Sequence, residues 1–399
     1  MHLNNMYLNT FDKYECCGCT ACEQVCTKKA ISMQPDNEGF SYPLVNKDLC
    51  VNCGLCEKVC AFVKPRYDNL STPKVYATFH KQVEERKRSS SGGLFYAIAQ
   101  WVISQGGTVF GAAFDDNLQL SHIGVDNLKD LEKLRGSKYL QSAMNGTYKN
   151  IKELLKQGCW VYFVGTGCQV AGLKAFLRMD YPKLLTSDLV CHGVPSQKIF
   201  NHHIAYLNKS INGTIIEYKF RNNAFWGVNE IYTYRNDKNV KSINTGHFAL
   251  SPYLFQFMYG YSYRYSCYNC KFAQIPRQGD ITLADFWGVK KFFPQIDAKT
   301  GVSLVLVNSE KGSVVWNAIK NNCEYYESKI EDGAKYNGNL VKQTKEPEIR
   351  KGIYEKIEKE GYEKIAETLF RPHNYRKIKV KLLITKTSLY RIAKKVFKR

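Results

Sequence analysis

The sequence lacks an apolar stretch long enough to cross a membrane. The longest, residues 94–103, contains Gln100 and falls short of the roughly 20 residues that a membrane-spanning helix needs. The N-terminal segment MHLNNMYLNTFDK also lacks the apolar region of a secretory signal. We therefore expect a cytoplasmic protein, in which the fifteen cysteines are reduced thiols and not disulfides. Reduced cysteines at this density indicate metal binding.

Acidic side chains are absent from the C-terminal segment. Residues 371–399 carry eleven Lys and Arg, about half of the formal net charge of +21. An apolar stripe at helical spacing runs through this segment and comprises Ile378, Leu382, Leu389, Ile392 and Val396. Such a helix can make a peripheral contact with an anionic membrane, or it can pack its stripe on the protein body or on a partner. No nucleic-acid-binding module accompanies the charge, so we expect no nucleic acid partner.

The distribution of cysteine divides the chain, whose 399 residues are enough for two or three domains. Nine of the fifteen cysteines lie at or before Cys60. We predict an α+β ferredoxin-like domain over residues 1–68, with a β-hairpin over residues 31–45. Alternating strand and helix patterns over residues 72–345 predict an α/β domain with a largely parallel sheet. Residues 346–399 are expected to form a basic helical tail.

A spaced cysteine motif occurs twice in the N-terminal segment. The pattern Cys-x2-Cys-x2-Cys-x3-Cys is typical of ferredoxins with two [4Fe–4S] clusters, in which the fourth cysteine of each run binds the other cluster. We therefore predict one cluster held by Cys16, Cys19, Cys22 and Cys60, and a second held by Cys50, Cys53, Cys56 and Cys26. Zinc sites usually present paired ligands and not such triplets. The sequence departs from the ferredoxin pattern at Thr27 and Ala61, where proline usually follows the fourth cysteine.

Four later cysteines are candidates for one further metal centre. They stand on loops that follow predicted strands or form a close pair, and they are Cys168, Cys191, Cys267 and Cys270. Loops at the carboxyl ends of parallel strands converge on one edge of a sheet, where ligands usually bind. Spacing alone leaves open the alternative that these are scattered structural cysteines. Cys17, Cys159 and Cys323 are expected to have no role in metal binding.

Two glycine-rich segments are candidate phosphate sites. GTGCQVAGL has Val170 where a dinucleotide fingerprint requires glycine, so it does not predict nucleotide binding. The segment SSSGG, residues 89–93, offers hydroxyl groups and free backbone N–H groups at a predicted helix start, which suits a phosphate. A simple helix N-cap is the alternative interpretation of the same residues.

Five motifs in a fixed order carry a resemblance to a known family. They are RSSSGGLF, GSKYLQS, GTGCQVAGL, DLVCHGVPS and CYNCKFAQIPRQGDITLADFWG. Together with the ferredoxin-type segment, they make residues 12–345 similar to the β subunit of coenzyme F420 hydrogenases and dehydrogenases, including formate dehydrogenase. The chain departs from the family at Gly167, where many members have proline, and beyond residue 350.

The resemblance implies a flavoprotein that holds FAD in the α/β domain. The positions matching the family's phosphate contacts are Ser89, Ser90, Ser91, Gly92 and Gly93. Those expected near the ring or the ribityl chain are Ser137, Lys138, Tyr139, Gln141 and Ser142. His192 is expected beside the ring, and Lys138 is expected to stabilise reduced flavin by its charge. The resemblance also favours a third [4Fe–4S] cluster at the four later cysteines. Asp280 and Asp285 match the family without an assigned role.

The expected function is that of an iron–sulfur flavoprotein oxidoreductase. It would exchange hydride at FAD with a deazaflavin such as coenzyme F420, or with another reducible substrate, and relay single electrons through [4Fe–4S] clusters. The alternative is a non-catalytic, ferredoxin-type electron-transfer subunit of a larger complex. Either function requires a redox partner protein or a complex subunit.

Overall fold

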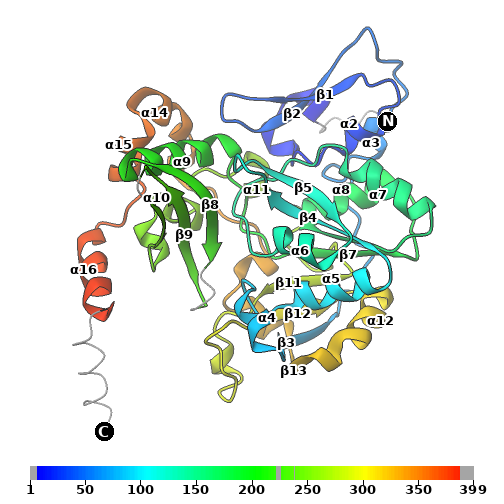
Figure 1. Ribbon diagram of the computed structural model, residues 1–399. Coiled ribbons are helices and arrows are strands. Elements are labelled where there is room, and N and C mark those ends of the chain that lie inside the picture. The colour runs from blue at the N-terminus through cyan, green and yellow to red at the C-terminus, as the bar shows by residue number, and fades with distance from the viewer. Residues whose placement is uncertain (1–6, 222–225, 238, 387–399) are drawn as a thin grey trace.

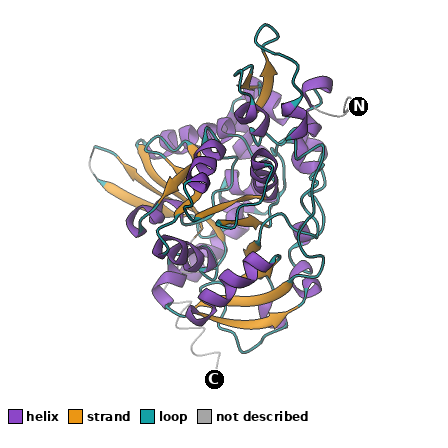
Figure 2. Cartoon of the chain, turned by 90° about the vertical axis from the view of Figure 1, so that its right-hand side faces the viewer, coloured by secondary structure: helices purple, strands orange, loops and turns teal. Residues whose placement is uncertain are grey.

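The computed structural model describes residues 7–221, 226–237 and 239–386. The chain forms a cysteine-rich N-terminal module, a large mixed sheet flanked by helices, and a smaller antiparallel sheet with its own helices (Figure 1). In both views the N-terminal hairpin projects at the top of the molecule (Figures 1 and 2). Within these ranges no helix has the length and hydropathy required to span a bilayer.

The N-terminal module contains the expected hairpin and three short helices. Strands β1 (Ile31–Pro35) and β2 (Ser41–Val45) pair antiparallel, with Ile31 opposite Val45. The turn between them is closed by the Asp36 carboxylate, which accepts hydrogen bonds from the backbone N–H groups of Glu38 and Phe40. The helices are α1 (Tyr7–Thr10), α2 (Ala21–Val25) and α3 (Leu55–Lys58). The hairpin prediction is confirmed.

The large sheet is parallel only at its centre. Its strands in spatial order are β13 (Cys323–Ser328), β3 (Lys74–His80), β12 (Ser303–Val307), β11 (Ile281–Asp285), β7 (Leu184–Leu189), β6 (Val161–Thr166), β4 (Thr108–Phe114) and β5 (Leu120–Val125). Strand β7 is parallel to β11 and β6, and β6 is parallel to β4. The other four pairings are antiparallel. The prediction of a largely parallel sheet was therefore wrong, because connections as short as that between β4 and β5 can only join antiparallel strands.

Helices cover both faces of this sheet. Alternate residues of β6 show the two faces, since Tyr162 packs with one helix layer while Val161 and Phe163 pack with the other. The first layer contains α5 (Leu94–Ser104), α6 (Leu128–Leu134) and α12 (Glu310–Ile319). The second contains α7 (Thr147–Lys156) and α8 (Gly167–Leu177), and it also buries Ala21 and Val59 of the N-terminal module. The module is therefore packed against the body through α7 and α8.

The smaller sheet and the C-terminal helices share one apolar core. Its strands are β8 (Thr214–Arg221), β9 (Val228–Arg235) and β10 (Val240–Asn244), and the helices packed with it are α9 (Gln197–Ile211), α10 (Pro252–Met258), α14 (Ile353–Glu360) and α15 (Tyr362–Thr368). Phe370 is fully buried in this core, so the C-terminal segment is part of the body up to this residue. Helix α16 (Tyr375–Lys386) follows, and Ile378 packs against the core. Leu389, Ile392 and Val396 of the expected stripe lie outside the described residues.

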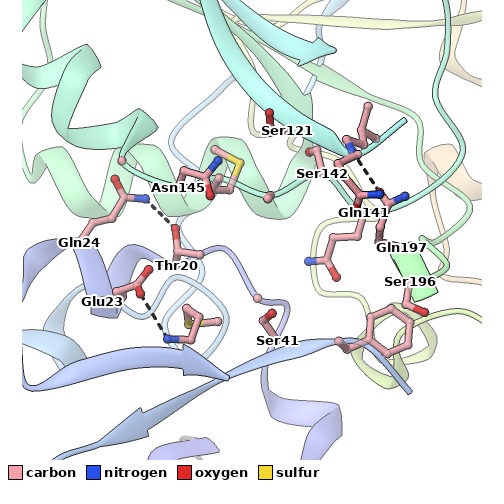
Figure 3. A pocket seen from close by; sticks show the side chains of 18 of the residues that line it. Thr20, Glu23, Gln24, Ser41, Ser121, Gln141, Ser142, Asn145, Ser196 and Gln197 are labelled. Atoms are coloured by element: carbon pink, nitrogen blue, oxygen red, sulfur yellow. Dashed lines mark hydrogen bonds between the residues drawn. The ribbon is translucent and has the colours of Figure 1, made fainter. Parts of the chain in front are cut away.

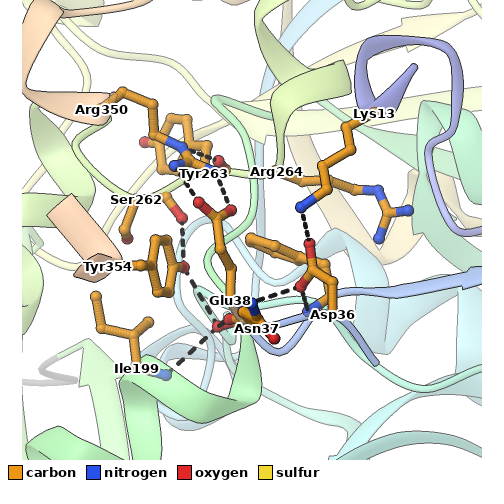
Figure 4. Close-up of polar contacts among 12 residues, drawn as sticks. Lys13, Asp36, Asn37, Glu38, Ile199, Ser262, Tyr263, Arg264, Arg350 and Tyr354 are labelled. Atoms are coloured by element: carbon orange, nitrogen blue, oxygen red, sulfur yellow. Dashed lines mark hydrogen bonds and ion pairs between the residues drawn. The ribbon is translucent and has the colours of Figure 1, made fainter. Parts of the chain in front are cut away.

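A buried ion pair fastens the hairpin turn to the C-terminal segment (Figure 4). The guanidinium of Arg350 binds both carboxylate oxygens of Glu38, with Nη1 at 2.9 Å from Oε1. Its Nε donates to the carbonyl of Tyr263 at 2.7 Å, and Ser196 Oγ donates to the carbonyl of Glu38 at 2.6 Å. Three parts of the chain that are distant in sequence therefore meet at this turn.

Replacing Arg350 with alanine should loosen the N-terminal module. Breaking a buried pair typically costs about 3–5 kcal/mol, and we expect the lower end because Glu38 remains partly exposed. Urea denaturation of the reduced protein measures the change. The matched control is Lys209→Ala, which removes an exposed pair with Glu363 and should leave the midpoint unchanged. Equal midpoints for both variants would contradict the fastening role.

Candidate functional site

The first predicted set of cysteines lies together in the N-terminal module. Cys16, Cys19, Cys22 and Cys60 line one small cavity beside Phe62. Burial raises the pKa of the Cys22 thiol, and the neighbouring thiolates of Cys19, Cys16 and Cys60 raise it further. The structure therefore places the last cysteine of the second run beside the first three of the first run, which is the grouping expected for this set.

The second predicted set lies toward the surface. Cys53 is exposed, while Cys26, Cys50 and Cys56 are half-buried. Cys26 Sγ accepts a hydrogen bond from the backbone N–H of Ala30 at 3.3 Å. In the described part of the chain, no three His, Cys, Asp or Glu side chains gather closely enough to hold a single metal ion.

The four later cysteines meet at the edge of the large sheet. Cys168 opens α8, Cys191 follows β7, and Cys267 lies in the short helix α11 (Tyr265–Tyr268). Burial raises the pKa of the Cys267 thiol, and Cys191, Cys270 and Cys168 add to this effect as near neighbours. The structure therefore brings these four residues together. This inner cysteine group comprises Cys168, Cys191, Cys267 and Cys270.

Cys17 lies between the two buried cysteine groups. Its side chain is 7 % exposed and packs with Cys19, Cys60, Cys168 and Cys270. The pKa of the Cys17 thiol is raised, first by its hydrogen bonds to Cys168 and Cys19. The sequence gives no sign that Cys17 lies between the two groups. Its position there depends on how the N-terminal module packs onto α8, which cysteine spacing does not encode.

A cavity of about 320 Å³ opens beside the inner cysteine group. Both motifs assigned to flavin reach it, since Ser89, Ser90, Ser91, Gly93, Ser137, Lys138, Tyr139 and Ser142 are among its lining residues. His192 and Cys191 line the same cavity. Ser90 Oγ accepts a hydrogen bond from the backbone N–H of Ser137 at 2.8 Å, which joins the two motifs. The cavity is therefore adjacent to a cysteine of the inner group.

The serine–glycine segment is held in place by the strands beneath it. The N–H of Gly92 donates to Ser303 Oγ at 3.0 Å, and a Cβ at this position would lie 2.7 Å from the Ser303 backbone nitrogen and closer still to the carbonyl oxygen of Thr78. No side chain caps the N-terminus of α5, although Gly93, Leu94 and Phe95 of this end line the cavity. The N-cap of α5 is therefore Gly93 without a side-chain hydrogen bond, and uncapped N–H groups at a helix start fit a phosphate.

An arginine–aspartate pair that the sequence did not single out forms another wall of the cavity. Arg221 binds both carboxylate oxygens of Asp285 at 2.9 Å and donates to the hydroxyl of Tyr139 at 2.9 Å. Its Nε is buried and has no hydrogen-bond partner among the described residues. Asp285 also accepts from Trp226 Nε1 at 2.6 Å. The sequence only matches Asp285 to the family motif, and its partner Arg221 lies in no motif.

Lys138 has no N–H group left for a ligand. Its Nζ donates to the carbonyls of Lys133, Leu134 and Arg135 at 2.9–3.1 Å, which uses all three protons. Burial lowers its pKa to about 7. In its protonated form, which this pKa favours only below about pH 7, the lysine can act on a bound group through its charge but not through a hydrogen bond.

The remaining predicted residues occupy different places. Gln141 does not line the 320 Å³ cavity, because its side chain points the other way and donates to the carbonyl of Cys17 at 3.0 Å. Gly92 is packed against Ser303, behind the cavity wall. Asp280 is buried and accepts hydrogen bonds from the N–H and hydroxyl of Thr186, which is a structural role. His192 stands near the ring of Phe257, and burial lowers its pKa.

A second and larger cavity, of about 790 Å³, lies between the N-terminal module and the body (Figure 3). Thr20, Gln24 and Ser41 reach it from the module, and Gln141 and Asn145 reach it from the body. Ser142 lines both cavities, and its hydroxyl binds His122 Nδ1 at 2.8 Å. Burial lowers the pKa of His122 to about 4, so the imidazole is neutral at pH 7.

Comparison with known proteins gives a match for each of two parts of the chain. Residues 15–63 match the 4Fe-4S dicluster domain, and residues 159–333 match the C-terminal domain of the coenzyme F420 hydrogenase/dehydrogenase β subunit. One subunit of the F(420)H(2) dehydrogenase of Methanosarcina mazei is 22% identical over 351 residues, which cover 78% of this chain and 91% of that protein.

Among solved structures, a chain of the F420-reducing [NiFe] hydrogenase complex from Methanosarcina barkeri is similar over 77% of this chain and 98% of that one. The two are 17% identical, with a TM-score of 0.43.

Proposed function

We propose that this chain is an iron–sulfur flavoprotein oxidoreductase, because residues 15–63 match the 4Fe-4S dicluster domain and residues 159–333 match the C-terminal domain of the coenzyme F420 hydrogenase/dehydrogenase β subunit. It exchanges hydride between FAD and a deazaflavin of the F420 type, or another reducible substrate. It passes single electrons to a partner subunit through three [4Fe–4S] clusters. Its domains are 1–68, 72–345 and the segment from 346.

The position of Cys191 is the observation that carries the proposal. This residue belongs to the inner cysteine group and also lines the cavity that the serine–glycine segment lines. A flavin exchanges electrons in pairs as hydride and releases them one at a time, whereas a [4Fe–4S] cluster carries one electron. A cavity with Cys191 in its wall suits the transfer between them.

The lining residues supply the contacts that such a cofactor needs. The uncapped start of α5 and Ser90 suit the phosphates, and Arg221 adds a guanidinium to the lining of the same cavity. Lys138 lines the same cavity, and because burial lowers its pKa to about 7, a negative charge bound there would favour its protonated form. His192 beside Phe257 lines the same cavity as Cys191.

The decisive experiment is anaerobic purification followed by cofactor analysis. Twelve predicted ligands correspond to about twelve irons per chain, together with one FAD. Addition of reduced F420, and of a panel of other hydride donors, should then bleach the flavin band and reduce the clusters. A protein that contains iron but no flavin would contradict the proposed enzymatic function and support the alternative of a non-catalytic electron-transfer subunit.

The basic C-terminal segment is proposed to make a peripheral contact with an anionic membrane from the cytoplasmic side. Residues 371–399 carry eleven basic and no acidic side chains, and the preceding Phe370 is the last fully buried residue of the described chain. Truncation after Phe370 should abolish flotation with phosphatidylserine vesicles and leave iron and flavin contents unchanged. Unchanged flotation would favour packing of this segment on a partner.

A further inference from the structure

Arg264 is a buried arginine whose guanidinium contacts the first cysteine group, which comprises Cys16, Cys19, Cys22 and Cys60. Its side chain is fully buried, at 1 % exposure for the residue. Nε donates to the carbonyl of Cys16 at 2.6 Å, and Nη2 lies 3.5 Å from Cys16 Sγ. The guanidinium also stacks over the ring of Tyr42 at 4.0 Å. Arg264 stands three residues before Cys267, so one short segment reaches both buried cysteine groups.

Among the described residues, four arginines are 4 % exposed or less, and Arg264 differs from the other three. Arg221, Arg277 and Arg350 each form an ion pair with a carboxylate, namely Asp285, Asp188 and Glu38 respectively. Arg264 makes no such pair with any described carboxylate, and its other side-chain partners are neutral. Because arginine stays protonated and an isolated buried charge is costly, the site requires another source of negative charge.

A [4Fe–4S] cluster held by four thiolates supplies that charge. With Cys16, Cys19, Cys22 and Cys60 around one cavity and Arg264 on the sulfur of Cys16, the cation lies in direct contact with the first ligand. Hydrogen bonds to the sulfurs and net charge are among the factors that set cluster potentials. Reduction adds one electron and one negative charge, with no bond broken, so a fixed cation favours the reduced form.

We propose that Arg264 raises the reduction potential of the cluster at Cys16, Cys19, Cys22 and Cys60 and so draws electrons outward from the inner cysteine group. The inference rests on the proposed function, because it requires both centres to hold clusters. Arg264 is not itself a cluster ligand. It donates a hydrogen bond to the carbonyl of Cys16, whereas its interaction with the Cys267 thiolate is electrostatic only.

The test is an anaerobic redox titration of Arg264→Gln and Arg264→Lys, followed by electron paramagnetic resonance. In the glutamine variant the reduction potential of the first cluster should fall by at least 59 mV, which is a tenfold change in the equilibrium constant for its one-electron reduction. Lysine keeps the charge and loses the planar fork, so its shift should be much smaller. Equal shifts in the two variants, or none in either, would overturn the proposal.

Two further variants keep the result interpretable. Lys209→Gln also removes one positive charge, but from an exposed pair with Glu363 outside the N-terminal module, and it should leave cluster potentials unchanged. If Arg264→Gln does not load iron, Gln141→Glu places a carboxylate within reach of the guanidinium, now 3.3 Å from the Gln141 amide oxygen, and should lower the same potential. Wild-type protein without iron would defeat the proposed function, whereas full iron with unshifted variants would defeat only this inference.

Discussion

Replacing Cys191 with serine is expected to disconnect the flavin from the N-terminal clusters. Four thiolates form the inner group, and Cys191 is the member that also lines the cavity. Without it the inner cluster should not assemble, so iron should fall from about twelve to about eight per chain. FAD should remain, because the serine–glycine segment and Arg221 are untouched.

Rapid mixing with a hydride donor measures this effect. The flavin band should still bleach, but reduction of the clusters should slow by more than about 100-fold, since loss of groups that merely support a metal ligand already costs 10–100-fold. Cys159→Ser is the matched control, because Cys159 is a half-buried cysteine that belongs to neither buried group, and this variant should behave as wild type. A Cys191→Ser protein that keeps all its iron and its rate would show that the inner group carries no electrons.

Replacing Gly92 with alanine should remove FAD while sparing the clusters. The added Cβ would lie 2.7 Å from the Ser303 backbone nitrogen and closer still to the Thr78 carbonyl oxygen, both of which are backbone atoms of the sheet. The segment must therefore shift, at a cost of about 1–3 kcal/mol. Because the same segment lines the cavity, we expect at least a tenfold weaker retention of FAD, equivalent to about 1.4 kcal/mol.

Cofactor content after gel filtration and a thermal melt together report this change. Gly146→Ala is the control, because nothing lies within 4 Å of its added Cβ and Gly146 does not line the 320 Å³ cavity. It should shift stability by no more than about 0.5 kcal/mol and keep FAD. If Gly92→Ala binds FAD as tightly as the control does, the phosphates do not sit against residues 89–93.

Local spacing in the sequence predicted the parts of the site that local chemistry determines. The hairpin at residues 31–45 followed from alternation and a polar turn, and the crossed grouping of Cys60 with Cys16 followed from the ferredoxin pattern. The gathering of Cys168, Cys191, Cys267 and Cys270 was a candidate from their places on loops after predicted strands, and the family resemblance favoured it over scattered structural cysteines. The matches at residues 15–63 and 159–333 cover all twelve of these predicted ligands.

Residues whose role arises from docking could not be found this way. Arg264 and Arg221 are single arginines without a motif, and their partners Cys16 and Asp285 lie 248 and 64 positions away. Gln141 and its neighbour Ser142 differ in that only Ser142 lines the 320 Å³ cavity. The direction of the Gln141 side chain depends on the local backbone conformation, which the sequence does not reveal. The antiparallel sheet edges were missed because an apolar strand pattern does not encode the direction of its neighbour.

The contact between Glu38 and Arg350 has a consequence for how the protein is made. The two residues are separated by 312 positions, which a ribosome covers in roughly 15–60 s at 5–20 residues per second. For that interval the nascent N-terminal cysteines have emerged while the segment that clamps their hairpin does not yet exist. Iron delivered during translation therefore reaches an open, accessible module, and completion of the chain closes it afterwards.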